Sequence, residues 1–291
     1  MLLFKRTLQF RRIDNGDNVV VVGPVWPNCK GTVFIMGGEA RTAPLRADEN
    51  GIWQLDLNDI RSRCDDRTRA VFVNSPGNPT GWIMEADQQR ELLAFTRERG
   101  IYLISDEVYI RLIYDRPRAP SFLDIAEPDD RVIVINSFSK TWSMTGWRLG
   151  YSVWPDALID KARKLSVNAW SCVNAPTQFA GIAALTGPQD EARAMVAEFD
   201  KRRKVVVEGL NALPNVTCRT PLGAFYFSLS LPIPPVSSQA AAFLAGEPYV
   251  MDYLASMDSD VQASARSRGW RLTEEEVLQV TPDGFGSTWL L

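Results

Sequence analysis

Histidine is absent from this sequence of 291 residues, and its absence removes a large part of enzyme chemistry. Histidine is the commonest general base and a frequent zinc ligand, and it completes the serine and cysteine hydrolase triads. An enzyme with this sequence must therefore move protons with lysine, tyrosine, aspartate, glutamate or a cofactor. No metal site is expected.

Cysteine is also scarce, and the four cysteines lie far apart: Cys29, Cys64, Cys172 and Cys218. Without a CxxC pair, the pattern favours neither a zinc knuckle nor a dense disulfide framework. It suits a reducing compartment, so we expect a cytoplasmic protein. No apolar run approaches the roughly 20 residues of a membrane-spanning helix, and no contact with a membrane is expected.

Uncompensated positive charge is missing as well, since the formal net charge is −3. Binding to a phosphate backbone depends on clustered lysine and arginine. The one basic run, Lys201 to Lys204, is flanked by Glu198 and Asp200, as on the solvated face of a helix. Nucleic acid is therefore not an expected partner.

Four short apolar stretches, rich in β-branched residues, lie at 19–22, 70–73, 101–104 and 132–135. Each is apolar on both faces, which is typical of strands in a parallel sheet covered by helices on both sides. Residues 84–100 between the second and third stretches have the pattern of a charged amphipathic helix that ends at glycine. The first part of the chain is thus predicted to be α/β, with a mostly parallel sheet sandwiched by helices.

The later part of the chain has a different pattern, which predicts a smaller α+β domain. The expected elements are a helix from 190 to about 213, a strand at 223–229, a helix at 237–257 and a strand at 277–281. We place the large domain at residues 1–187 and the small C-terminal domain at 188–291.

Polar clusters follow three of the predicted strands. They are Asn78-Pro79-Thr80-Gly81, Asp106-Glu107-Val108-Tyr109 and Ser137-Phe138-Ser139-Lys140. Open α/β sheets bind ligands at the carboxyl ends of their strands, so one pocket could collect all three clusters. Taken singly, each has an ordinary reading as a turn, a cap with a core aromatic, or a surface lysine.

The stretch from Ser137 to Gly150, SFSKTWSMTGWRLG, resembles the lysine signature of the class I and II aminotransferases. The first two polar clusters resemble two further motifs of that family, in the same order. Val25-Trp26-Pro27-Asn28 and the segment from Pro221 to Tyr226 resemble two more. The resemblance runs from about residue 14 to about 286, and the aspartate and prephenate aminotransferases are the most similar members. It implies fold type I and the cofactor pyridoxal 5′-phosphate (PLP).

The resemblance also implies the catalytic roles. Lys140 would hold the cofactor as a Schiff base and, once released, would shuttle the proton, because a desolvated lysine amine is both nucleophile and base. Asp106 would face the pyridine nitrogen and keep it protonated. Tyr109 and Asn78 would donate hydrogen bonds to the phenolic oxygen of the cofactor.

Further residues would bind the rest of the cofactor. The resemblance assigns Arg148, Ser137 and Ser139 to the phosphate, whose charge suits a guanidinium with hydroxyls around it. Trp26 would stack on the ring. An ion pair is the alternative role for Arg148, and core packing is the alternative for Trp26.

Compared with the family, the chain is expected to be truncated at both ends. Relatives have roughly a hundred more residues at the amino end, while here residues 14–19 already resemble the strand that follows them. At the other end, 280–286 resemble the approach to an arginine that binds the substrate carboxylate, which the final residues Ser287 to Leu291 lack. A homodimer is expected if the family interface survives.

The predicted activity is transfer of an amino group between an amino acid, aspartate-like or of broad range, and a 2-oxo acid. Two alternatives stay open. The same fold and cofactor also support other chemistry, such as that of a β-lyase or a synthase. The second alternative is a catalytically inactive, truncated remnant of such an enzyme.

Overall fold

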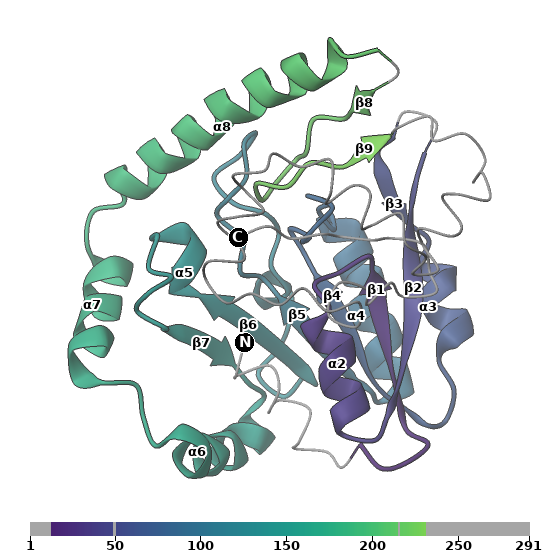
Figure 1. Cartoon of the computed structure of the whole chain (residues 1–291). Coiled ribbons are helices and arrows are strands. Elements are labelled where there is room, and N and C mark those ends of the chain that lie inside the picture. The colour runs from purple at the N-terminus through teal and green to yellow at the C-terminus, as the bar shows by residue number, and fades with distance from the viewer. Residues whose placement is uncertain (1–12, 49–50, 215, 231–291) are drawn as a thin grey trace, which may run out of the picture. The chain divides into compact units, whose positions relative to one another are not determined.

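A central sheet organises the part of the chain that the computed structural model describes, residues 13–48, 51–214 and 216–230 (Figure 1). Its strand order is β3-β2-β1-β4-β5-β6-β7. The strands are β1 (Asn18–Gly23), β2 (Glu39–Ala47), β3 (Trp53–Leu55), β4 (Thr68–Asn74), β5 (Tyr102–Asp106), β6 (Val132–Ser137) and β7 (Gly150–Val153). The four predicted strands are β1, β4, β5 and β6, which lie side by side in the middle of the sheet.

The sheet is mostly parallel, as predicted. β1 pairs in parallel with β2 and β4, and β4, β5 and β6 continue in the same sense. Only the two edge strands, β3 and β7, run antiparallel to their neighbours. Parallel strands end at the same edge of a sheet, so the segments after β4, β5 and β6 emerge together.

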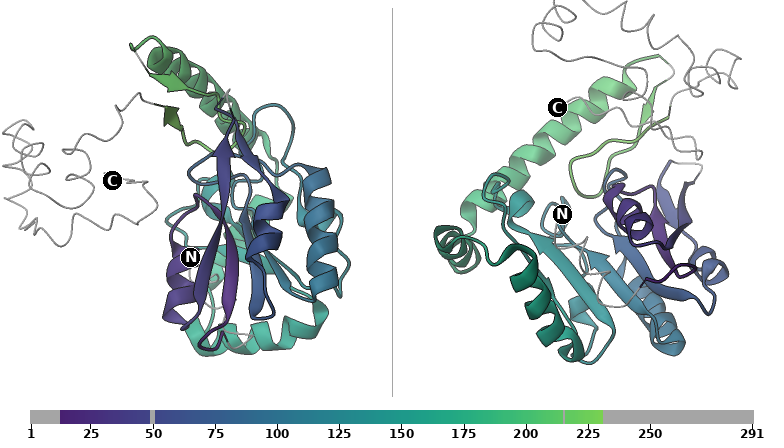
Figure 2. Two further views of the ribbon diagram at one scale, coloured as in Figure 1. Left: turned by 90° about the vertical axis from the view of Figure 1, so that its right-hand side faces the viewer. Right: turned by 60° about the horizontal axis from the view of Figure 1, so that its bottom comes forward.

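Helices cover both faces of the sheet (Figure 2). Alternate residues of each central strand point to opposite faces, which produces two apolar clusters. One cluster joins the sheet to α3 (Leu57–Arg63) and α4 (Ala86–Arg99). The other joins it to α2 (Asn28–Ile35) and α6 (Asp156–Trp170). Burial on both faces explains why the central strands are apolar throughout.

The predicted helix at 84–100 is α4, and its sequence explains its end. Gly100 adopts a left-handed conformation with φ of 61° at the C-cap, which glycine tolerates best. Arg97 and Arg99 lie in the last turn, where positive charge is favourable.

The remaining elements are α5 (Phe138–Thr141), α7 (Ala175–Thr186), α8 (Asp190–Asn211), a 3-10 turn η2 (Phe122–Asp124), β8 (Thr217–Cys218) and β9 (Leu229–Ser230). The helix predicted from residue 190 is confirmed as α8. The strand predicted at 223–229 is wrong, because only β9 at its end is a strand. Ala224 has φ of 56°, a left-handed conformation that breaks an extended run.

The helix predicted at 237–257 and the strand predicted at 277–281 lie outside the described residues. The division of the chain after residue 187 therefore stays a prediction. The part from residue 13 to Ser230 belongs to a single compact unit. None of the helices in the described ranges has the length and apolar character that crossing a membrane requires.

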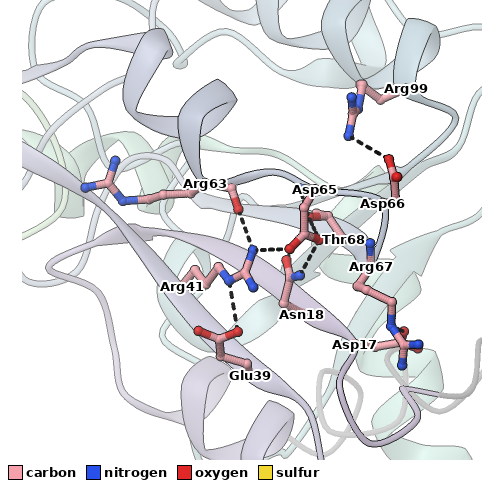
Figure 3. Close-up of polar contacts among 10 residues, drawn as sticks. All are labelled: Asp17, Asn18, Glu39, Arg41, Arg63, Asp65, Asp66, Arg67, Thr68 and Arg99. Atoms are coloured by element: carbon pink, nitrogen blue, oxygen red, sulfur yellow. Dashed lines mark hydrogen bonds and ion pairs between the residues drawn. The ribbon is translucent and has the colours of Figure 1, made fainter.

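A network of charged side chains surrounds the amino ends of the central strands (Figure 3). Arg41 on β2 contacts Asp65 at 2.6 Å and Glu39 at 2.9 Å. Asp17, just before β1, is buried and contacts Arg69 at 2.8 Å and Arg67 at 3.1 Å. The hydrogen bond from Arg69 holds the pKa of Asp17 below its usual range. This edge of the sheet, opposite the polar clusters, thus has a stabilising role.

Asp17→Asn is expected to lower the free energy of unfolding by about 1 to 3 kcal/mol at pH 7, because two guanidinium groups lose a charged acceptor. A depressed pKa contributes stability above the unfolded value of 3.8, and this stability is lost as pH falls through the folded pKa. Denaturant unfolding should therefore show a smaller difference in the free energy of unfolding between the unmutated chain and Asp17→Asn at pH 3 than at pH 7. As a control, Asp66→Asn, at a fully exposed aspartate 3.8 Å from Arg99, should change stability by less than about 0.5 kcal/mol.

Candidate active site

The three polar clusters meet at one edge of the sheet, as their positions after strands predicted. β4 ends at Asn74, β5 at Asp106 and β6 at Ser137, and the register pairs Asn74 with Asp106. A cavity of about 870 Å³ opens there. All eight predicted site residues line it: Trp26, Asn78, Asp106, Tyr109, Ser137, Ser139, Lys140 and Arg148.

Lys140 lies on the short helix α5, directly after β6, and its side chain is half-buried between aromatic rings. Its Nζ atom is 5.1 Å from the ring centre of Phe225 and 5.6 Å from that of Tyr109. Burial lowers the pKa of Lys140, and the nearby positive charge of Arg148 lowers it further. A depressed pKa increases the fraction of neutral amine, which is the nucleophilic form.

Asp106 is the last residue of β5, and its carboxylate lines the same cavity. Burial raises the pKa of Asp106 to about 6. Its Oδ1 accepts a hydrogen bond from the backbone of Val108 at 3.2 Å, and no lysine or arginine of the described ranges pairs with it. A buried carboxylate is costly without a positive partner. Asp106 is therefore suited to bind a protonated ring nitrogen.

Asn78 and Tyr109 line the same cavity. The Asn78 backbone is fixed by its N–H, which donates to Asn74 Oδ1 at 2.7 Å, and by its carbonyl, which accepts from the Trp26 N–H at 2.9 Å. The Tyr109 hydroxyl is 2.6 Å from that of Tyr226. Burial and this hydrogen bond raise the pKa of Tyr109, so its hydroxyl stays protonated and can donate.

Two buried side-chain atoms in the described part of the chain have no hydrogen-bond partner, and both residues line the cavity. They are Asn78 Oδ1 and Asn28 Nδ2. Buried polar atoms in folded proteins are almost always paired, so an unpaired one indicates a missing partner. These two atoms lack hydrogen-bond partners, and the Asp106 carboxylate lacks a lysine or arginine partner in the described ranges. The three groups fit a polar ligand that supplies hydrogen bonds and a positive charge.

The residues expected to bind phosphate also line the cavity. The Ser137 Oγ accepts from the Ser139 N–H at 3.1 Å, which caps α5. Arg148 is exposed, has φ of 56° and donates from Nη1 to the Thr145 carbonyl at 2.6 Å. No carboxylate in the described ranges forms an ion pair with Arg148, the alternative role considered for it. Its guanidinium remains suited to an anionic ligand.

Trp26 reaches the cavity from the turn between β1 and α2, and 41 % of its surface is exposed. This exposure argues against the alternative role of Trp26 as an ordinary core residue, and its indole lies where it could stack on a ligand in the cavity.

Two residues of the site were not predicted to belong to it. Tyr226 contacts Tyr109, and Phe225 contacts Lys140. The sequence contained a signal, because both belong to the segment Pro221 to Tyr226 that resembled a family landmark. That resemblance did not reveal that the segment returns to the cavity, since about 80 residues separate it from Lys140.

The chain was compared with known proteins. The family described as aminotransferase class I and II matches residues 5–287. The chain is 36 % identical over 219 residues to an aspartate aminotransferase of Rhizobium meliloti, covering 74 % of this chain and 52 % of that protein. It is 33 % identical over 248 residues to a probable aspartate/prephenate aminotransferase of Aquifex aeolicus, covering 83 % of this chain and 60 % of that protein.

Solved structures give the same result. A crystal structure of the aspartate aminotransferase from Rhizobium meliloti matches with a TM-score of 0.72 and 34 % identity, over 79 % of this chain and 57 % of that one. An alanine aminotransferase from Pyrococcus furiosus matches with a TM-score of 0.71 and 34 % identity, over 80 % and 59 %. The chain thus spans a little over half the length of the relatives it matches.

Proposed function

The chain belongs to the class I and II aminotransferases, and from that membership we propose that it catalyses PLP-dependent transamination at the cavity around Lys140. The observation that carries this proposal is the meeting in one cavity of Lys140 and the Asp106 carboxylate, which forms no ion pair with a lysine or arginine of the described ranges. When bound there, PLP supplies an electron sink for the bonds at the substrate α-carbon.

Lys140 and Asp106 would perform the central roles. The Lys140 amine would hold the cofactor covalently until substrate displaces it. The released amine would then be the base that takes the proton from the substrate α-carbon and delivers it to the C4′ carbon of the cofactor. Asp106 would hold the proton on the pyridine nitrogen, and its desolvated position would strengthen that interaction because the local dielectric constant is low.

The remaining residues would bind and orient the cofactor. Tyr109 and Asn78 donate hydrogen bonds to its phenolic oxygen, and Trp26 stacks on its ring. Arg148, Ser137 and Ser139 hold the phosphate, with Arg148 providing the positive charge.

We propose an amino acid, aspartate-like or of broad range, and a 2-oxo acid as the substrates. The names of the aspartate aminotransferases among the relatives support this choice. A homodimer in the cytoplasm, acting in amino acid metabolism and biosynthesis, is the proposed context. Exposed apolar side chains on α7, Phe179, Ile182 and Leu185, support a protein partner surface. The four free cysteines suit a reducing compartment.

The test is to incubate the chain loaded with PLP with aspartate, with and without 2-oxoglutarate. Continuous turnover is expected only with the oxo acid. Without it, release of one oxo acid per site should end the reaction, because the amino group stays on the enzyme. Steady release of ammonia without an oxo acid would indicate elimination, as in a β-lyase. A cofactor bound to the chain that never reacts with amino acids would indicate an inactive remnant.

A further inference from the structure

A segment that follows α8, residues 221–226, closes the cavity beside Lys140. It is held on two sides. Arg203 on α8 donates from Nη1 to the Pro221 carbonyl at 2.6 Å. The Ala224 N–H donates to the Leu112 carbonyl at 2.8 Å. The segment is therefore fixed by contacts outside the cavity, and its side chains can be placed accurately.

Its backbone packs too closely against neighbouring loops to be displaced easily. A Cβ atom on Gly81 would lie 2.8 Å from the Gly223 carbonyl oxygen, and one on Gly223 would lie 2.9 Å from Pro76 Cβ. Ala224 is fully buried with φ of 56°, a conformation that costs alanine about 1 kcal/mol or more. Such strain persists only where the surroundings fix it. Of the two side chains that follow, Tyr226 lines the cavity and Phe225 lies near Lys140.

The two side chains that follow contact the proposed catalytic groups. The Phe225 ring centre is 5.4 Å from that of Tyr109, edge to face, and lies next to Lys140 Nζ. The Tyr226 ring also meets Tyr109 edge to face, with centres 5.7 Å apart, and the two hydroxyls are 2.6 Å apart. This hydroxyl pair is short enough to be a strong hydrogen bond.

We propose that Tyr226 is a positioning residue, whose hydroxyl donates to the Tyr109 oxygen and so directs the Tyr109 proton to the phenolic oxygen of the cofactor. The inference depends on the proposed function. A tyrosine hydroxyl has one proton, and Tyr109 can give it to only one acceptor. A negatively charged phenolic oxygen is a better acceptor than a neutral tyrosine. Tyr226 then becomes the donor in the pair, and the two hydrogen bonds strengthen each other.

The experiment is a pH titration of the absorption of the chromophore that Lys140 forms with PLP, in the whole chain. Tyr226→Phe removes only the hydroxyl. It should weaken the hydrogen bond from Tyr109, leave more negative charge on the phenolic oxygen and hold the proton on the Lys140 nitrogen more tightly. The chromophore pKa is expected to rise by about 0.5 to 1 unit. An unchanged pKa in a folded variant overturns the inference.

A double-mutant cycle separates positioning from a direct effect. Tyr109→Phe should raise the chromophore pKa more than Tyr226→Phe does. In the Tyr109→Phe background, Tyr226→Phe should add less than about 0.2 units, because the residue through which it acts is gone. An equal shift in both backgrounds would show that Tyr226 acts on the cofactor directly, and would overturn the positioning role.

Failure of the proposed function gives a different result. If the unmutated chain forms no chromophore, or if Lys140→Ala forms the same one, the site does not bind PLP through Lys140 and both proposals fail. The unfolding temperature of each variant, measured without cofactor, shows whether it is folded, and the Tyr226→Phe ring should keep its packing against Phe225.

Discussion

Lys140→Ala is expected to lower the rate of transamination by at least about 10⁴-fold, because one amine acts as both nucleophile and base. Among the described residues, Lys140 is the one lysine that lines the cavity, and burial lowers its pKa. Alanine keeps the helix propensity of α5 and removes only the amine and its alkyl chain. The measurement is the initial rate of oxo acid formation with saturating PLP, amino acid and acceptor.

Lys161→Ala provides the matched control, since Lys161 is an exposed lysine on α6. Its rate should stay within about twofold of that of the unmutated chain, because exposed side chains rarely affect distant sites. The assignment of Lys140 would be contradicted if both variants lost activity equally, or if Lys140→Ala retained more than about a tenth of the rate.

The second large effect is expected at Asp106, where activity and stability should change in opposite directions. Asp106→Asn should lower the transamination rate by about 10² to 10³-fold, because asparagine cannot hold a proton on the pyridine nitrogen. The same change should raise the free energy of unfolding of the cofactor-free chain by about 1 to 3 kcal/mol at pH 8, because it removes a desolvated charge that pairs with no lysine or arginine of the described ranges.

The pH dependence of stability tests whether the Asp106 charge destabilises the folded chain. Burial raises the pKa of Asp106 from 3.8 to about 6, so the folded chain binds this proton more tightly than the unfolded chain does. The contribution of Asp106 to stability therefore falls as pH rises from about 4 to about 6 and stays low above that. Asp106→Asn removes this decline. Denaturant unfolding at pH 4.5 and pH 8 should show that the free energy of unfolding of the variant exceeds that of the unmutated chain mainly at pH 8.

Asp130 provides a control at which the Asp→Asn substitution should change stability in the opposite direction. It is paired with Arg97, which lowers the pKa of Asp130, so Asp130→Asn should destabilise the chain at pH 8. If Asp106 were only a cap that accepts from Val108, Asp106→Asn would also destabilise the chain and would leave activity intact. That outcome would contradict the role assigned to Asp106.

The central strands could be predicted from sequence because each of them is buried on both faces. Val19 to Val22 on β1 and Val132 to Ile135 on β6 have no polar face, a pattern that parallel sheets require. The edges of the sheet could not be predicted in this way. β2 is partly exposed and contains Pro44 and two arginines, and β3 has three residues, so their burial depends on neighbours far along the chain.

The placement of the eight expected residues around one cavity followed from a general rule, since three of their segments follow parallel strands. The contribution of residues 221–226 did not follow from that rule. The sequence predicts a strand at 223–229, whereas the left-handed Ala224 breaks it, and with the contact of Arg203 the chain brings Tyr226 to the cavity. Tertiary contacts thus decide the conformation where local sequence preference does not.

Unfavourable features gather in this cavity. They include the buried Asp106 carboxylate, the unpaired Asn78 Oδ1, and the left-handed backbone at Arg148 and Ala224. Each costs folding free energy, and together they mark a site shaped for binding. The amino edge of the sheet is the reverse, because Asp17 and Asp65 there are both paired with arginine. The amino ends of the central strands thus carry stabilising ion pairs, and their carboxyl ends carry the candidate active site.

The most direct test of the site is to fix the cofactor to the residue that carries it. The chain is incubated with PLP, reduced with borohydride, digested and analysed by mass spectrometry. Our account predicts the pyridoxyl label on Lys140 in the unmutated chain and in Tyr226→Phe, and no specific label in Lys140→Ala. A label on another lysine, or one that persists unchanged in Lys140→Ala, would contradict it.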